Sequence, residues 1–100
     1  MYTFKADPSH GWLGVSLKEL IELGVERSIT NFSYFDPSTG TAWLEEDCDV
    51  ATFLMAKVGK DREAIQQWFQ QNIKEVNTNG MSKIRSLPSY SQVITMLDKA

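Results

Sequence analysis

Residues 31–57, NFSYFDPSTGTAWLEEDCDVATFLMAK, constrain the fold more than any other part of the chain. The run DPSTG at 36–40 predicts a tight turn, because Asp accepts nearby amide hydrogens, Pro presets φ and Gly allows a positive φ. The aromatic and branched residues around Tyr34 and Trp43 favour an extended backbone on both sides. The segment therefore predicts the central hairpin of a small sheet.

An acidic corner and a helix are expected after the hairpin. The corner comprises Glu45, Glu46, Asp47, the only cysteine Cys48, and Asp49. Asp47 or Asp49 is predicted to cap the helix, because a short carboxylate accepts the free amides of a first turn. Apolar residues then recur at helical spacing, and the helix is expected to end at a glycine. These residues are Val50, Phe53, Leu54, Val58 and Gly59.

Short elements are predicted before the hairpin. Residues 1–4 and 12–15 read as strands joined by the loop 7–11. Ser16 and Glu19 form a capping-box pattern, which predicts a short helix that stops at Gly24.

Residues 60–100 predict further helices. Asp61 is expected to cap an amphipathic helix whose apolar stripe runs from Ile65 to Val76. The segment 83–87 reads as a last strand, and a second capping box at 89–92 predicts a closing helix. The whole predicts a single α+β domain over 1–100, in which three to four helices cover a small, mainly antiparallel sheet.

Composition narrows the class of protein. One hundred residues with 42% hydrophobic content suit one core and are too few for two. A lone cysteine excludes an intrachain disulfide framework and suits a reducing compartment. No apolar run approaches the ~20 residues of a membrane span. We therefore expect a cytoplasmic protein that does not enter a membrane.

The charge is unevenly distributed along the chain. Residues 1–56 carry three cations and nine anions, a net charge of −6, whereas residues 57–100 carry seven cations and four anions, a net charge of +3. An acidic half predicts a partner with a basic surface. The alternative is that the two sections neutralise one another within one domain.

Two groups of residues invite a chemical interpretation. His10 lies beside Asp7 and Ser9, but the chain has no nucleophile elbow, and the acids around Cys48 disfavour its thiolate. We expect no catalytic residue, and expect His10 to cap its loop or pack on Trp12. The acids at 45–49 could supply oxygen ligands to a cation. Neighbours on a strand point to opposite faces, so we expect no metal site and no cofactor.

Several segments look like a group of small proteins encoded on phages and plasmids. They are DPSHGWL at 7–13, ELGV at 22–25, Ser33-Tyr34, LEEDCD at 44–49 and IRS at 84–86. The resemblance carries over no functional residue. It implies an accessory protein of a mobile element, and such proteins often bind and block host machinery, including CRISPR effectors. The order of strand, Ser-capped helix and hairpin also resembles the swapped-hairpin fold of transition-state regulators, although the basic residues that contact phosphates are missing.

We therefore predict a non-enzymatic, anti-CRISPR-like accessory protein in the host cytoplasm that binds a host protein or complex through an acidic surface. The predicted partner-binding residues are Tyr34, Asp36, Trp43, Glu45, Glu46, Asp47 and Asp49. One alternative is a metal-assisted hydrolase that uses His10 and the acids at 45–49. A second alternative is a nucleic-acid-binding regulator, although direct nucleic-acid binding is not expected. The sequence is compatible with a monomer or a homodimer.

Overall fold

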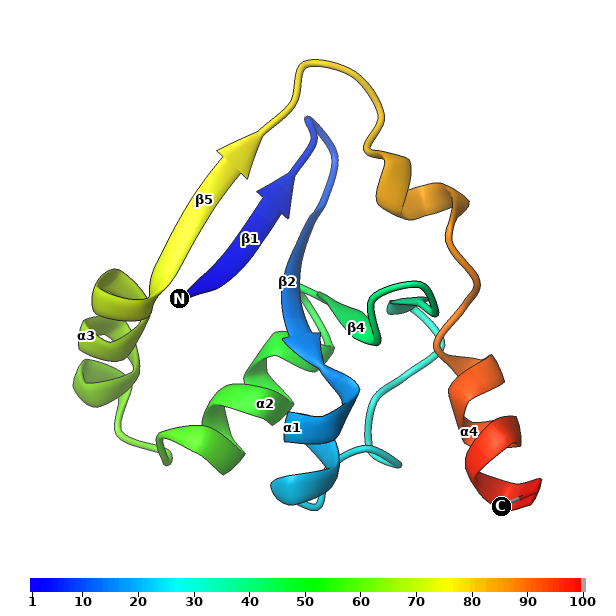
Figure 1. The fold of residues 1–100 in the computed structure, drawn as a ribbon. Coiled ribbons are helices and arrows are strands. Elements are labelled where there is room, and N and C mark those ends of the chain that lie inside the picture. The colour runs from blue at the N-terminus through cyan, green and yellow to red at the C-terminus, as the bar shows by residue number, and fades with distance from the viewer. Residues whose placement is uncertain (100) are drawn as a thin grey trace.

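The computed structural model describes residues 1–99 and shows an α+β fold around one five-stranded sheet (Figure 1). The strands are β1 (Tyr2–Ala6), β2 (Gly11–Ser16), β3 (Tyr34–Asp36), β4 (Thr41–Glu45) and β5 (Ile73–Asn77). Their order in the sheet is β3-β4-β2-β1-β5. All neighbours are antiparallel except β1 and β5, which are parallel. The predicted α+β class and the mainly antiparallel sheet are confirmed.

Four α-helices and one 3-10 helix complete the fold. They are α1 (Leu17–Glu22), α2 (Asp49–Lys57), α3 (Arg62–Asn72), η1 (Lys83–Ser86) and α4 (Ser91–Lys99). The predicted cap of α1 is present, because the Ser16 hydroxyl accepts a hydrogen bond from the Glu19 amide at 3.1 Å. The predicted hairpin is also present: β3 pairs with β4 across a turn in which Gly40 has a φ of 73°. Its second strand, β4, lies inside the sheet between β3 and β2.

One face of the sheet carries the main core. Leu13 and Val15 of β2 and Leu44 of β4 are at most 1% exposed, and they belong to a cluster that includes Leu20 of α1 and Phe53 of α2. α3 adds an aromatic edge to this core. Its Trp68 ring lies 5.2 Å from Tyr2 of β1 and 6.0 Å from Phe53. Because side chains alternate along a strand, Leu13, Val15 and Leu44 point to the face of the sheet that the helices cover.

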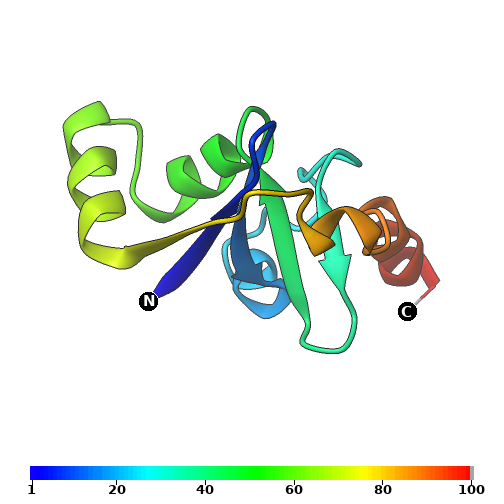
Figure 2. The same ribbon diagram turned by 90° about the horizontal axis from the view of Figure 1, so that it is seen from above.

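The opposite face of the sheet, called the outer face below, is covered by the chain that follows β5. Figure 2 shows α2 and η1 on opposite sides of the sheet. Trp12 of β2 points to the outer face and is only 2% exposed. The guanidinium of Arg85 in η1 lies 5.2 Å from the centre of the Trp12 ring. The sheet is therefore sandwiched between helices on one side and a short irregular segment on the other.

Two elements differ from the sequence expectation in the second half of the chain. The amphipathic helix ends at Asn72 rather than continuing to Val76, and residues 73–77 form β5. These five residues pair with the whole of β1, which satisfies their backbone groups through the sheet, so tertiary pairing overrides the helical period. The predicted strand 83–87 is instead η1, in which the Ser82 hydroxyl accepts from the Ile84 amide at 3.2 Å.

The start of α2 also differs from the expectation. Its N-cap residue is Cys48, and no side chain caps the helix. Asp49 is 1% exposed and accepts hydrogen bonds from the amide and hydroxyl of Thr30 and from the Ser33 hydroxyl. This carboxylate therefore joins the loop before β3 to α2, because a buried charge requires several donors.

Tyr90 gives the fold a testable dependence on alkaline pH. It is fully buried and donates its hydroxyl hydrogen to the Glu26 carbonyl at 2.5 Å. Burial, together with the negative charges of Glu26 and Asp49, raises the pKa of Tyr90 from 10.0 to about 12. Because the folded pKa is the higher one, this stabilisation is complete below pH 10 and is lost as the pH rises toward 12.

We expect Tyr90→Phe to lower the free energy of unfolding at neutral pH by about 1 kcal/mol, since one hydrogen bond is lost. The variant should also lose less stability than the wild type between pH 10 and pH 12. Urea titrations of both proteins at pH 8 and pH 11 measure the two effects. A stability difference that is the same at both pH values would contradict this assignment.

Candidate functional site

The turn between β1 and β2 is organised by one carboxylate. Oδ1 of Asp7 accepts hydrogen bonds from the amides of Ser9 and His10, each at 2.9 Å. The Asp7 amide in turn donates to the His10 carbonyl at 2.9 Å. An Asp at the start of a turn commonly makes such local bonds. The backbone that carries His10 is therefore held in one conformation.

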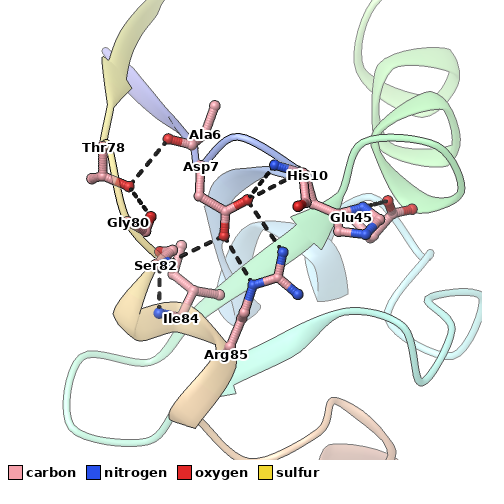
Figure 3. Close-up of polar contacts among 10 residues, drawn as sticks. Ala6, Asp7, His10, Glu45, Thr78, Gly80, Ser82, Ile84 and Arg85 are labelled. Carbon is pink, nitrogen blue, oxygen red and sulfur yellow. Dashed lines mark hydrogen bonds and ion pairs between the residues drawn. The ribbon is translucent and has the colours of Figure 1, made fainter.

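The same carboxylate anchors the segment that covers the outer face. Arg85 donates from Nε to Oδ2 of Asp7 at 2.9 Å and from Nη2 to Oδ1 at 3.2 Å, and the Ser82 amide adds a bond of 3.1 Å (Figure 3). The Asp7 side chain is 1% exposed. The hydrogen bonds from Arg85, and then those from the amides, hold the pKa of this carboxyl well below its usual range. Asp7 is thus ionised and fully engaged.

Sequence reasoning did not identify Arg85 as the partner of Asp7. The two residues lie 78 positions apart, and the segment around Arg85 was expected to be a strand. The sequence did contain one signal, an arginine among apolar residues. Its guanidinium is always charged, so it needs a carboxylate partner when it packs against the protein. The pattern alone could not choose among the acids of the chain.

The end of β4 lies against this turn. Trp12 pairs directly with Glu45 in the sheet, and the Glu46 amide donates to the Gly11 carbonyl at 3.0 Å. Glu45 is 8% exposed, and its Oε2 accepts from the Asp47 amide at 2.9 Å. Its Oε1 faces Nδ1 of His10 at 3.7 Å, beyond hydrogen-bonding distance (Figure 3). The His10 ring also lies 6.2 Å from the ring of Trp12, the neighbour expected from the sequence.

The predicted acidic corner divides into exposed and buried parts. Glu46 and Asp47 are exposed, Glu45 is nearly buried, and Asp49 is buried below the loop before β3. Cys48 is also exposed. Partial desolvation, a hydrogen bond with Glu45 and the charges of neighbouring acids raise the pKa of its thiol, so the reactive thiolate is disfavoured.

The remaining predicted residues lie on the outer face or in the hairpin turn. Trp43 covers Gly14, where an added Cβ would come within 2.7 Å of the indole, and Lys5 Nζ lies 4.8 Å from the Trp43 ring centre. Tyr34 contacts Trp12 with their ring centres 6.2 Å apart. Asp36 accepts from the Ser38 amide at 2.9 Å, so its carboxylate acts within the turn.

Ion pairs between the two halves of the chain neutralise part of the charge asymmetry. Lys57 pairs with Glu19 at 2.9 Å, Arg27 with Asp98 at 2.5 Å, and Arg85 with Asp7 at 2.9 Å. Within residues 1–99, neither Glu46 nor Asp47 makes an ion pair through its side chain. Internal neutralisation therefore holds for part of the chain and leaves these two carboxylates free.

Comparison with known proteins gives no match among family models, curated proteins or solved structures. The resemblance to phage and plasmid proteins therefore stays a prediction. Over residues 1–99, none of the helices has the length and apolar character that crossing a membrane requires.

Proposed function

We propose that this chain is a non-enzymatic accessory protein of a phage or related mobile element that binds a basic surface on a host protein or complex and inhibits or modulates it. The proposed contact surface, called the acidic end below, consists of Glu46 and Asp47 together with the exposed His10. The observation that carries the proposal is the pair of exposed carboxylates without an ion-pair partner in the described chain. Such charges are available to attract an oppositely charged partner.

The backbone of the acidic end is ordered by contacts with the sheet. The Glu46 amide is bonded to the Gly11 carbonyl, and the Asp47 amide is bonded to the Glu45 carboxylate. A surface that is already ordered loses less conformational entropy on binding than a flexible loop does. This preorganisation supports direct, stoichiometric contact as the mode of action.

Two aromatic side chains could extend the contact area. Tyr34 and Trp43 are partly exposed on the outer face of the sheet, the same face to which Glu45 points. Partly exposed Tyr and Trp are common anchors of protein interfaces. The proposal therefore assigns association to the acidic end and anchoring to these two rings.

Affinity capture from a host lysate tests the proposal with two charge-reversed variants. Glu46→Lys/Asp47→Lys removes the acidic end, whereas Glu22→Lys/Glu75→Lys changes the net charge equally at exposed sites elsewhere. Surface changes of this kind usually alter stability by under ~0.5 kcal/mol. We expect the wild type and the control to capture the same protein and the first variant to lose it. Capture of that protein by all three would contradict the proposal.

A further inference from the structure

Three side chains from separate parts of the fold converge at the acidic end, and two of them, His10 and Asp47, belong to it. His10 comes from the β1–β2 turn, Glu45 from the last position of β4, and Asp47 from the turn before α2. One ligand atom from each lies within 4.8 Å of the other two. We infer that these residues form a site for a divalent first-row metal ion of the zinc class, which shares His10 and Asp47 with the proposed contact surface.

The donor atoms match this class of ion. An imidazole nitrogen and two carboxylate oxygens are the ligands that zinc and its neighbours accept, whereas calcium and magnesium prefer oxygen alone. Two atoms bound to one zinc ion can be no more than about 4.2 Å apart, because each bond is ~2.0–2.2 Å long. Donor atoms at the 4.8 Å limit must therefore approach one another by at least about 0.6 Å. The exposed side chains of His10 and Asp47 can make this adjustment.

The buried member of the group distinguishes the site from an ordinary cluster of surface acids. Glu45 is 8% exposed, yet its Oε1 faces Nδ1 of His10 at a distance too long for a hydrogen bond. Within residues 1–99, neither ring nitrogen of His10 makes a hydrogen bond. An imidazole free of hydrogen bonds can coordinate a metal ion, and an ion between Oε1 and Nδ1 would hold both atoms by coordination.

The surrounding structure fixes the ligands at the level of the backbone. The Asp7 carboxylate bonds the His10 amide, and the Glu45 carboxylate bonds the Asp47 amide through the oxygen that does not face His10. Hydrogen bonds to a ligating carboxylate, such as the bond from the Asp47 amide to Glu45, orient metal ligands in known sites. The alternation argument from sequence does not apply to Asp47, because β4 ends at Glu45 and Asp47 lies in the following turn, where its amide bonds the Glu45 carboxylate.

Titration of the purified full-length chain with Zn²⁺ in a calorimeter tests the inference. We expect one ion per chain, and an affinity at least tenfold weaker in His10→Ala and in Glu45→Gln. The matched controls are Glu46→Gln, which removes an adjacent exposed acid outside the group, and Cys48→Ser, which removes the nearby thiol. Both controls should bind Zn²⁺ as the wild type does, and circular dichroism should show that all variants are folded.

Two outcomes would overturn the inference. One is the absence of saturable Zn²⁺ binding to the wild type. The other is binding that survives in His10→Ala and Glu45→Gln but is lost in Cys48→Ser, which would assign the ion to the thiol. Cobalt substitution gives an independent readout, since a sulfur ligand produces an intense near-ultraviolet band that nitrogen and oxygen ligands do not.

Discussion

Replacing Trp12 with alanine should lower the free energy of unfolding by about 3–5 kcal/mol, the usual cost of deleting a buried aromatic side chain. Trp12 is 2% exposed and fills the space between the sheet and η1, where it contacts Arg85 and Tyr34. Its indole nitrogen has no hydrogen-bond partner in the described chain, so the loss comes from packing and from the contact with the Arg85 guanidinium. The same change at Trp43 or Trp68 should cost less, because both are partly exposed.

Urea denaturation of the three tryptophan variants measures this order. The slope of unfolding free energy against urea should stay constant if each variant keeps the native fold. A loss in Trp12→Ala no larger than that in Trp43→Ala would show that the segment after β5 does not cover the outer face as described.

The decrease in melting temperature caused by Asp7→Asn should be several times the decrease caused by Asp36→Asn. Asp7 is buried and accepts bonds from Arg85 and from three amides, whereas Asp36 acts within an exposed turn. The asparagine keeps the shape but removes the charge, and Arg85 then loses its ionic partner against the sheet.

A double-mutant cycle with Arg85→Gln isolates the interaction between Asp7 and Arg85. If the two side chains stabilise the fold through each other, the double variant should be more stable than the sum of the single losses predicts. Strictly additive losses would mean that Asp7 acts only through the backbone of its turn.

Local chemistry made much of the first half of the chain predictable. The turn at 36–40 has the Asp, Pro and Gly that such a bend requires, and Ser16 caps α1 as its pattern indicates. These patterns involve residues close together in the sequence, so they can be recognised without knowledge of the tertiary fold. The prediction that the helix continues through 73–77 was wrong, because these residues pair with β1, which lies about 70 residues away in the sequence.

The sequence identified the residues of the candidate site but not their arrangement. The sequence pointed to His10 and to the acids at 45–49, and it joined them only in the alternative of a metal-assisted hydrolase. It could not show that the pairing of β2 with β4 places Glu45 opposite Trp12 and brings His10 to 3.7 Å from its carboxylate. Nor could it show that Asp49 faces the Ser33 hydroxyl instead of solvent. Strand register places Glu45 beside the β1–β2 turn, and register is a property of the whole sheet.

The association rate with the captured protein tests the role of the acidic end most directly. It should be measured at two salt concentrations for the wild type, for Glu46→Lys/Asp47→Lys and for the control Glu22→Lys/Glu75→Lys. Electrostatic steering accelerates association by ~10–10³-fold and is screened by salt over ~8–10 Å. We expect the wild type and the control to associate more slowly at high salt, and Glu46→Lys/Asp47→Lys to associate at least about tenfold more slowly at low salt. Equal rates for all three proteins, without dependence on salt, would contradict a function for these carboxylates in partner binding.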